Sequence, residues 1–82
     1  MEITVYILFS TSCRKFYSGQ TQNLQNRLTE HNHGETESIK KCIPWTLVWS
    51  FRASTRSQAV QIETKIKKRG AKRFLIDNNI AV

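Results

Sequence analysis

Alternation of apolar and polar positions predicts a β-strand at the start of the chain. Ile3, Val5, Ile7 and Phe9 occupy every second position of residues 2–10. A period of two, combined with many β-branched and aromatic side chains, is typical of a strand. The intervening positions also include apolar side chains, so we expect both faces of this strand to be covered to some degree.

A hairpin is expected next. Residues 11–13 (Thr-Ser-Cys) have the composition of a short turn, and residues 14–19 would return as a second strand. We expect this second strand to end at Gly19. The first two strands would therefore be antiparallel neighbours.

A first helix is predicted over residues 23–32. Asn23 is a favourable helix N-cap, and Leu24 and Leu28 lie four positions apart on one apolar stripe. Residues 32–44 then lack apolar periodicity and contain several basic side chains. A loop of that length in a short chain is more often functional than idle, so we expect a functional basic loop here.

A third strand is predicted over residues 45–51, WTLVWSF. Its large apolar side chains again recur at every second position. The pattern places four of them on one face of the strand: Trp45, Leu47, Trp49 and Phe51.

Two helices are expected in the last third of the chain. Thr55 and Gln58 fit a capping box, with Thr55 as the N-cap. The inward stripe of the helix that follows comprises Ala59, Ile62 and Ile66. Basic residues in its last turn suit the negative end of the helix dipole, and Gly70 can supply the C-terminal cap. A last short helix is expected over residues 71–79.

The predicted order of elements is therefore ββαβαα. This order favours an α/β fold of the α+β kind, in which helices flank a small three-stranded antiparallel sheet. A chain of 82 residues has the length of one domain. We accordingly expect residues 1–82 to form a single domain.

Composition narrows the classes of partner. The formal net charge is +7 at pH 7, which favours a polyanionic partner, most often nucleic acid. No apolar run approaches the roughly 20 residues that span a bilayer, so we expect no membrane segment. The acidic Glu2 and the lack of a small-residue cleavage site also argue against a secretory signal. A cytoplasmic location is expected, with Cys13 and Cys42 as free thiols.

Several kinds of chemistry are absent from the sequence. It has no phosphate-cradling glycine-rich loop and no G-x-S-x-G motif. The zinc-type ligands are Cys13, His31, His33 and Cys42, and their spacing matches no closed zinc finger. A solvated surface position is the ordinary explanation for His33.

A more informative set comprises Tyr6, Tyr17, Arg27, His31 and Glu63. Arg27 and His31 lie four positions apart, so their side chains project together from one helix. Each member also has an ordinary structural explanation. The tyrosines are good strand formers, Arg27 can cover apolar surface with its stem, and Glu63 can pair with a lysine four positions later. Composition and spacing leave both interpretations open.

Taken in order, these residues resemble the GIY-YIG nuclease family. Its first signature appears as Thr4-Val5-Tyr6 and its second as Tyr17-Ser18-Gly19. Residues 23–32 resemble the family's first helix, with its arginine and histidine. Pro44-Trp45 resembles the start of the third strand, and residues 56–67 resemble the helix with the metal-binding glutamate. The match spans residues 3–76 and looks most like the stand-alone, single-domain bacterial branch.

The resemblance implies a fold, an activity and a cofactor. It implies a GIY-YIG-like fold and hydrolysis of a DNA phosphodiester bond with one divalent ion, Mg²⁺ or Mn²⁺, bound by Glu63. Tyr6 or Tyr17 would help to activate water, with Tyr6 as the favoured base and Tyr17 as a positioning group. A free phenol has a pKa of about 10, so the tyrosine must be ionised or relayed through a metal-bound water or His31 at neutral pH, and Arg27 and the metal would favour the phenolate.

The resemblance implies roles for further residues. Arg27 would neutralise charge on the phosphoryl oxygens, and His31 would share or donate a proton. Gly19 would permit a close approach of the backbone. Asn78 is a candidate for an asparagine that some members place near the metal glutamate. Gln20 occupies a position where members that act in DNA repair often have a lysine.

We expect the basic residues to contact DNA phosphates around this site. They are Lys15, Lys40, Lys41, Lys65, Lys67, Lys68, Arg69, Lys72 and Arg73. The expected substrate is DNA selected by structure or damage, as in repair, recombination or processing, with targeting by a protein partner or a homodimer. The alternative is a DNA- or RNA-binding module that keeps the fold without catalysis.

Overall fold

The structure is a computed structural model that describes residues 2–33 and 41–80. Its element order confirms the prediction of ββαβαα. The strands are β1 (Ile3–Ser10), β2 (Lys15–Thr21) and β3 (Trp45–Ala53), and the helices are α1 (Leu24–Asn32), α2 (Arg56–Arg69) and α3 (Ala71–Asp77). The middle of the predicted basic loop, with Lys40, lies outside the described residues.

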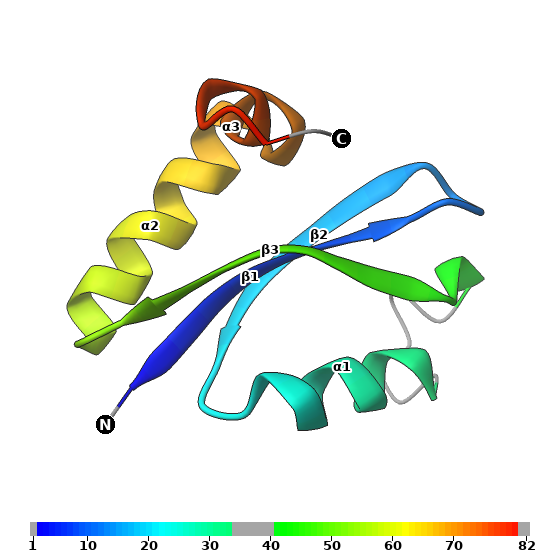
Figure 1. Cartoon of the computed structure of the whole chain (residues 1–82), viewed down its shortest axis with the longest axis horizontal. Coiled ribbons are helices and arrows are strands. Elements are labelled where there is room, and N and C mark those ends of the chain that lie inside the picture. The colour runs from blue at the N-terminus through cyan, green and yellow to red at the C-terminus, as the bar shows by residue number, and fades with distance from the viewer. Residues whose placement is uncertain (1, 34–40, 81–82) are drawn as a thin grey trace.

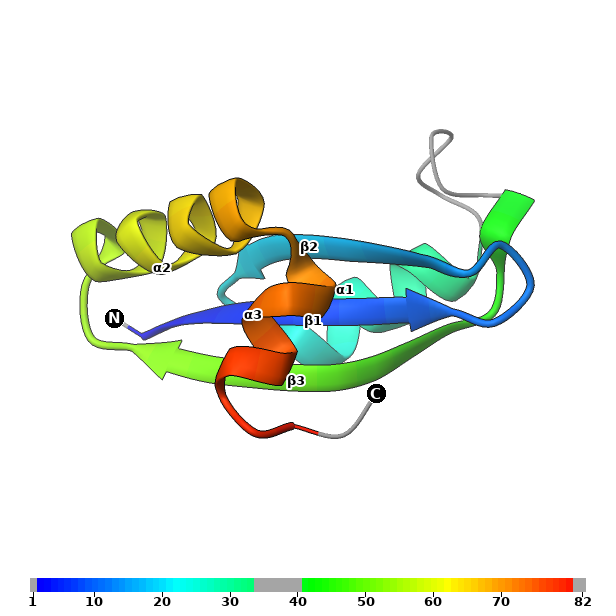
Figure 2. The ribbon, with the colours of Figure 1, turned by 90° about the horizontal axis from the view of Figure 1, so that it is seen from above.

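The three strands form one antiparallel sheet in the order β2-β1-β3. Helix α1 covers one face of the sheet, whereas α2 and α3 lie on the other, as Figures 1 and 2 show. β1 is thus enclosed by a strand on each side and by a helix layer on each face. The chain belongs to the predicted α+β class.

Side chains of β1 alternate between two apolar clusters. Ile3, Val5 and Ile7 pack with α2 and α3, whereas Tyr6 and Leu8 pack on the opposite face with α1. All five are buried. The expectation that both faces of this strand are covered is therefore confirmed.

The third strand differs from its predicted pattern. The β1–β3 register shifts between Ile7, which pairs with Trp49, and Leu8, which pairs with Leu47. Val48 is the extra residue of this bulge, and beyond it the side chains change faces. Trp45 consequently packs on the α1 side and Trp49 on the α2–α3 side. The prediction of one shared apolar face is wrong, because a period of two cannot register an inserted residue.

The predicted helix caps are confirmed. The Asn23 side chain accepts a hydrogen bond from the Asn26 amide at 3.0 Å, and Thr55 Oγ1 accepts one from the Gln58 amide at 3.1 Å. Gly70 ends α2 at a φ of 92°, in the region that favours glycine. Its amide donates to the Ile66 carbonyl at 2.8 Å, and α3 starts at the next residue.

Three predicted boundaries were wrong. β2 continues past Gly19 to Thr21, β3 extends to Ala53, and α3 ends at Asp77. The extension of β2 matters for the site, because it makes Gly19 an internal strand residue paired with Tyr6.

The cysteines are joined in a disulfide, so the prediction of free thiols is wrong. Cys13, in the β1–β2 turn, and Cys42, just before β3, have Cα atoms 5.3 Å apart. Their separation along the chain is 29 residues. Folding brings the two segments together at one end of the sheet, and neither cysteine count nor spacing could show this.

Over residues 2–33 and 41–80, none of the helices has the length and apolar character needed to cross a membrane.

Candidate active site

The ring of Tyr6 lies across Gly19. The two residues are opposite each other in the β1–β2 pair, on the face that α1 covers. A Cβ atom at position 19 would lie 2.7 Å from the Tyr6 hydroxyl oxygen and 3.0 Å from Cζ. Glycine is therefore needed here for space above the strand. The group that lies against Gly19 is the Tyr6 phenol, and the expected role of Gly19 in a close approach of the backbone stays a prediction.

The Tyr6 hydroxyl reaches a buried histidine. Its oxygen lies 3.2 Å from Nε2 of His31, which projects from the last turn of α1. The side chains of both residues are almost fully buried. Tyr17 presents its ring edge-on to His31, with ring centroids 5.0 Å apart, and also packs on Trp45. Three of the predicted site residues thus form one aromatic cluster between β1, β2 and α1.

A neighbouring asparagine anchors the end of α1 to β3. Asn32 Nδ2 donates to the Trp45 carbonyl at 3.1 Å, and Asn32 Oδ1 accepts from the Trp45 amide at 2.6 Å. This pair of bonds fixes the helix turn that contains His31. Sequence reasoning missed this role of Asn32, since its only signal was its position next to His31.

Burial dominates the electrostatics of Tyr6. It raises the pKa of the Tyr6 phenol to about 12, and the nearby Tyr17 raises it as well. Arg27 lowers the pKa of Tyr6, whereas Glu63 and Glu30 raise it. Arg27 and Glu63 are thus both close enough to act on this hydroxyl. Without a metal ion the attraction of Arg27 is outweighed, so Tyr6 is a neutral phenol at pH 7. This favours the relay through His31 over the phenolate as the form in which Tyr6 would act.

His31 is the complementary proton acceptor. Burial lowers the pKa of its imidazole below the usual 6.5, and the positive charge of Arg27 lowers it further. The ring is therefore neutral at pH 7, and Nε2 can accept the hydrogen bond that the Tyr6 hydroxyl donates. Nδ1 is buried and has no hydrogen-bond partner among the described residues.

Glu63 has one paired and one unpaired oxygen. Its Oε2 lies 2.8 Å from Lys67 Nζ, and this hydrogen bond raises the pKa of Lys67. The ion pair that composition suggested therefore exists. Oε1, in contrast, is buried without a hydrogen-bond partner among the described residues. The ion pair thus accounts for Oε2 and leaves Oε1 without a partner among the described residues.

The orphaned oxygen fits a divalent cation. A buried carboxylate oxygen without a donor is costly unless a donor or a cation satisfies it. Mg²⁺ often takes only one or two protein carboxylates and completes its octahedron with water and phosphate oxygens. In the part of the chain that the structure describes, no three His, Cys, Asp or Glu side chains gather as a ready-made metal cluster. Glu63 is the residue that would hold the ion.

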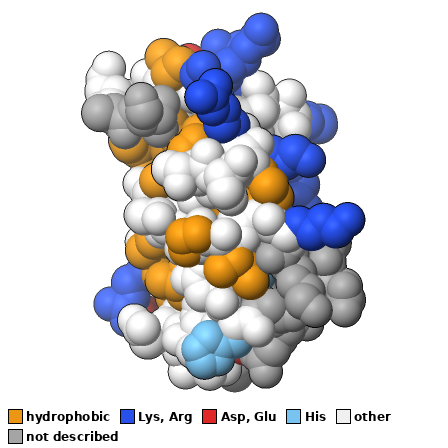
Figure 3. Space-filling model, turned by 90° about the vertical axis from the view of Figure 1, so that its right-hand side faces the viewer, with side chains coloured by type: hydrophobic (Ala, Val, Ile, Leu, Met, Phe, Trp, Pro, Cys, Tyr) orange, Lys and Arg blue, Asp and Glu red, His pale blue; other side chains and the backbone are white. Residues whose placement is uncertain are grey.

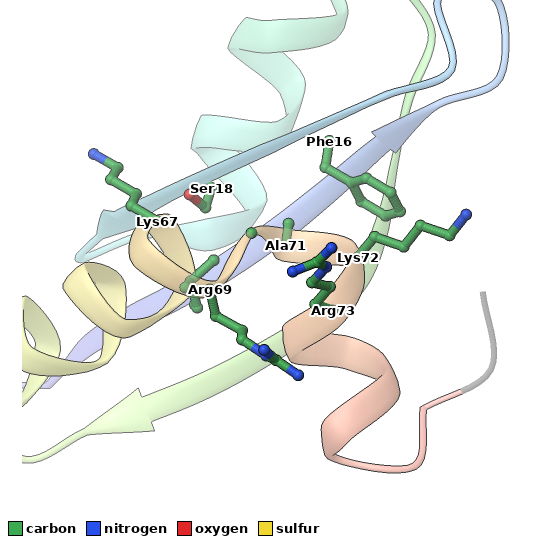
Figure 4. A pocket seen from close by; sticks show the side chains of 9 residues that line it. Phe16, Ser18, Lys67, Arg69, Ala71, Lys72 and Arg73 are labelled. Atoms are coloured by element: carbon green, nitrogen blue, oxygen red, sulfur yellow. The ribbon is translucent and has the colours of Figure 1, made fainter.

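Four of the predicted phosphate contacts line one groove, which Figure 4 shows. It lies between β2 and the α2–α3 junction and has a volume of about 470 Å³. The basic side chains in its wall are Lys67, Arg69, Lys72 and Arg73. The groove is separate from the aromatic cluster, and Lys67, through its ion pair with Glu63, is the link between them.

The other predicted residues have different surroundings. Lys65 and Lys68 are exposed on α2 and do not line this groove, and Lys15 and Lys41 are exposed elsewhere. Asn78 is exposed at the end of α3, where its Nδ2 donates to the Phe74 carbonyl at 2.8 Å. The structure therefore assigns Asn78 a contact within its own helix and not with Glu63.

A basic residue absent from the predicted set lies near the groove. Arg14, at the β1–β2 turn, and Lys72 share a second hollow whose wall includes Phe9 and Phe16. Viewed from the side of this turn, Lys and Arg side chains gather along one margin beside apolar groups, as Figure 3 shows. Arg14 was missed because it was the first residue of a predicted strand and carried no motif.

Comparison with known proteins identifies the family of this chain. The model of the GIY-YIG catalytic domain matches residues 2–75. The chain therefore belongs to the GIY-YIG family, a family of nucleases that act on nucleic acid and generally use divalent metals.

Its relatives belong to the UPF0213 group, the stand-alone branch of that family. A UPF0213 protein of Photorhabdus laumondii is 34% identical over 65 residues, which cover 78% of this chain and 62% of the relative. One of Bacillus licheniformis is 32% identical over 71 residues, which cover 83% of this chain and 73% of the relative. The chain thus spans less than two thirds of the length of the first of these relatives.

The fold matches a solved member of the same group. The solution structure of a UPF0213 protein from Bacillus halodurans superposes with a TM-score of 0.57 at 25% sequence identity. The match covers 94% of this chain and 84% of that protein.

Proposed function

We propose that this protein is a divalent-metal-dependent endonuclease that hydrolyses phosphodiester bonds in DNA. The observation that carries the proposal is the buried 3.2 Å contact between the Tyr6 hydroxyl and His31 Nε2, within electrostatic range of Arg27 and Glu63. A structural core has no need of a phenol, an imidazole, a guanidinium and a carboxylate at one place. Phosphodiester hydrolysis needs a group of each kind.

In this proposal Tyr6 and His31 act as a proton relay. A phenol whose pKa is about 12 is too weak an acid to be ionised at pH 7. It can take a proton from the attacking water only if its own proton leaves at the same time. Neutral His31 accepts that proton at Nε2. Burial raises the pKa of Tyr6, so the phenol is not ionised at pH 7. Burial also lowers the pKa of His31, so the imidazole that accepts the proton is neutral.

The remaining side chains act on the phosphate. Arg27 neutralises charge that develops on the phosphoryl oxygens, for which its planar fork is suited. Glu63 holds Mg²⁺ or Mn²⁺ through Oε1, and the bound ion supplies Lewis-acid stabilisation of the phosphate. Tyr17 positions the His31 ring through their edge-on contact.

Substrate binding is proposed for the basic groove. Lys67, Arg69, Lys72 and Arg73 line it together, and contacts of lysine and arginine to phosphates position a nucleic acid without reading its sequence. Arg69 is partly committed, since it forms two hydrogen bonds with Asp77. DNA selected by its structure or damage is the substrate that such sequence-independent contacts favour.

The cellular setting remains a matter of proposal. A role in repair, recombination or processing, and targeting by a partner or a homodimer, are predictions from the family. A cytoplasmic location is a prediction from the composition and the cysteines, and it would have to accommodate the Cys13–Cys42 disulfide in a compartment that keeps thiols reduced.

One observation favours the alternative of a binding module without catalysis. The Lys67 ammonium pairs with Glu63 at 2.8 Å, and a cation already held there would compete with a metal ion. A module of this kind would bind nucleic acid through the groove and leave it intact.

Incubation with labelled DNA and RNA of several structures separates the two functions. We expect the wild-type protein to cut DNA with Mg²⁺ or Mn²⁺ and not with EDTA, and Glu63→Gln to retain DNA without cutting it. The matched control is Glu2→Gln, because Glu2 forms an exposed pair with Arg52 at another place. Retention of DNA by all variants without cleavage by any would establish the binding module instead.

A further inference from the structure

A second buried oxygen lies on the side of β2 that faces α2. Gln20 Oε1 is buried and has no hydrogen-bond partner among the described residues, as is the case for Glu63 Oε1. Gln20 pairs with Val5, and Val5 packs in the cluster that includes Ala59 and Ile66 of α2. The Gln20 side chain therefore projects toward α2.

The direction of α2 sets the levels of these two residues relative to each other. Figures 1 and 2 both show α2 running in the direction opposite to β2. Ser18 lies beside Lys67 in the groove (Figure 4). A step of two strand residues is about 6.6 Å and one helical turn about 5.4 Å. Gln20, two residues beyond Ser18, is therefore level with the preceding turn of α2, which contains Glu63.

The electrostatics of Tyr6 support this placement independently. Its hydroxyl lies against Gly19, the neighbour of Gln20, and the charge of Glu63 acts on the pKa of the same hydroxyl. The carboxylate of Glu63 is accordingly within electrostatic range of this hydroxyl.

Two neighbouring buried acceptors require a positive or donating group between them. Each oxygen left unsatisfied costs about 1–3 kcal/mol, and an amide oxygen and a carboxylate oxygen repel each other when nothing lies between them. Carboxylate and amide oxygens are also the protein ligands that hard divalent cations prefer. The pair has the composition of a two-oxygen cation site.

We propose that Gln20 is a second protein ligand of the divalent ion and binds it through Oε1, together with Glu63 Oε1. This proposal rests on the proposed function, which assigns the ion to Glu63. The Lys67 ammonium already neutralises the Glu63 carboxylate, so the site gains from another oxygen that adds no competing positive charge.

Binding of Mn²⁺ to the protein without DNA, measured by electron paramagnetic resonance, tests this assignment. We expect Gln20→Met to weaken Mn²⁺ binding about tenfold, in line with the cost of losing groups around a metal ion. Gln20→Glu should tighten it by a similar factor, and Glu63→Gln should abolish it. Gln22→Met is the matched control, because Gln22 is exposed beyond the end of β2.

The variants distinguish the possible failures. If Gln20→Met binds Mn²⁺ as Gln22→Met does, with binding still dependent on Glu63, Gln20 is not a ligand and the proposed function stands. The same conclusion follows if Gln20→Glu weakens binding, since Gln20 would then act as a donor to Glu63 through Nε2. If Mn²⁺ binding is absent or independent of Glu63, both proposals fail. Unfolding by urea without Mn²⁺ verifies that each variant is folded.

Discussion

Tyr6 can reach His31 because residue 19 has no side chain. The phenol occupies the space where a Cβ atom would stand, and its hydroxyl continues to the imidazole. Three residues from two strands and one helix therefore depend on a single glycine. The conformational freedom of glycine has no part in this requirement.

Gly19→Ala should lower the free energy of unfolding by about 1–3 kcal/mol, as is usual for overpacking. The added methyl group would displace the Tyr6 ring and break its contact with His31. Urea unfolding measures this loss. Ser18→Ala is the control, because Ser18 directly precedes Gly19 in β2 and its side chain points to the α2–α3 face of the sheet. Equal stability of Gly19→Ala and the wild type would contradict the close contact.

His31 should make the free energy of unfolding depend on pH in the acidic range. Because its pKa is lowered on folding, the unfolded chain binds a proton below about pH 6.5 and the folded protein does not. Stability from this residue is thus complete above pH 6.5 and lost as the pH falls toward the folded pKa. The slope should not exceed about 1.4 kcal/mol per pH unit.

Unfolding by urea at several pH values measures this effect. His31→Gln should flatten the slope between pH 6.5 and the lower end of the transition, whereas His33→Gln, which removes an exposed histidine, should leave it unchanged. An unchanged slope in His31→Gln would show that this imidazole is not the group responsible.

At the residue scale, sequence reasoning identified side chains better than their states. The family signatures pointed to Tyr6 and His31, which are in contact, and to Glu63, whose charge acts on the Tyr6 hydroxyl. The sequence left open whether Tyr6 is ionised or relayed, because its burial depends on α1 covering the sheet. The orphaned oxygen of Gln20 was also beyond prediction, since it depends on the direction in which α2 passes β2.

The disulfide closes a loop that contains most of the candidate site. Between Cys13 and Cys42 lie the whole of β2 and α1, with Tyr17, Arg27 and His31. Tyr6 and Glu63 lie outside the loop, on β1 and α2. The disulfide thus joins the two ends of the segment that carries Tyr17, Arg27 and His31.

Removal of this disulfide should cost about 2–4 kcal/mol of stability, the usual range for a closed loop of this kind. The variant is Cys13→Ser with Cys42→Ser, and urea unfolding under non-reducing conditions is the measurement. Reduced wild-type protein is the control and should match the double variant. If reduction leaves the midpoint of unfolding unchanged, the disulfide does not hold these segments together in solution.

At the scale of elements, hydrophobic periodicity predicted the order of strands and helices better than the pairing within the sheet. The caps at Asn23, Thr55 and Gly70 were found because each depends on local chemistry. The bulge at Val48 was missed because it depends on how β3 pairs with β1. The disulfide was missed for the same kind of reason, since two distant segments must meet before it can form.

At the scale of the whole molecule, four basic side chains line the groove in which the proposed substrate would lie. The net charge of +7 says only that a polyanion is favoured. The structure narrows this statement to a groove of four basic side chains beside Glu63. Two of the four, Lys67 and Arg69, are already paired with carboxylates.

The salt dependence of DNA binding should show whether the other two side chains, Lys72 and Arg73, contact phosphates. Replacing Lys72 and Arg73 by glutamine removes two phosphate contacts, which should reduce the slope of log K against log salt by about 1.4–1.8. Filter binding at several salt concentrations measures the slope. The control removes two charges elsewhere, with Arg52→Gln and Arg56→Gln, and an equal change in both double variants would argue against the groove as the DNA site.

The most direct test of the account is the rate of DNA cleavage by Tyr6→Phe in a single turnover with Mn²⁺. This change removes the hydroxyl of the Tyr6–His31 pair and keeps the ring that covers Gly19. We predict a loss of rate of about 10²–10⁴-fold, the usual contribution of general acid–base catalysis, with retention of DNA unchanged. Cleavage at the wild-type rate would contradict the proposed proton relay.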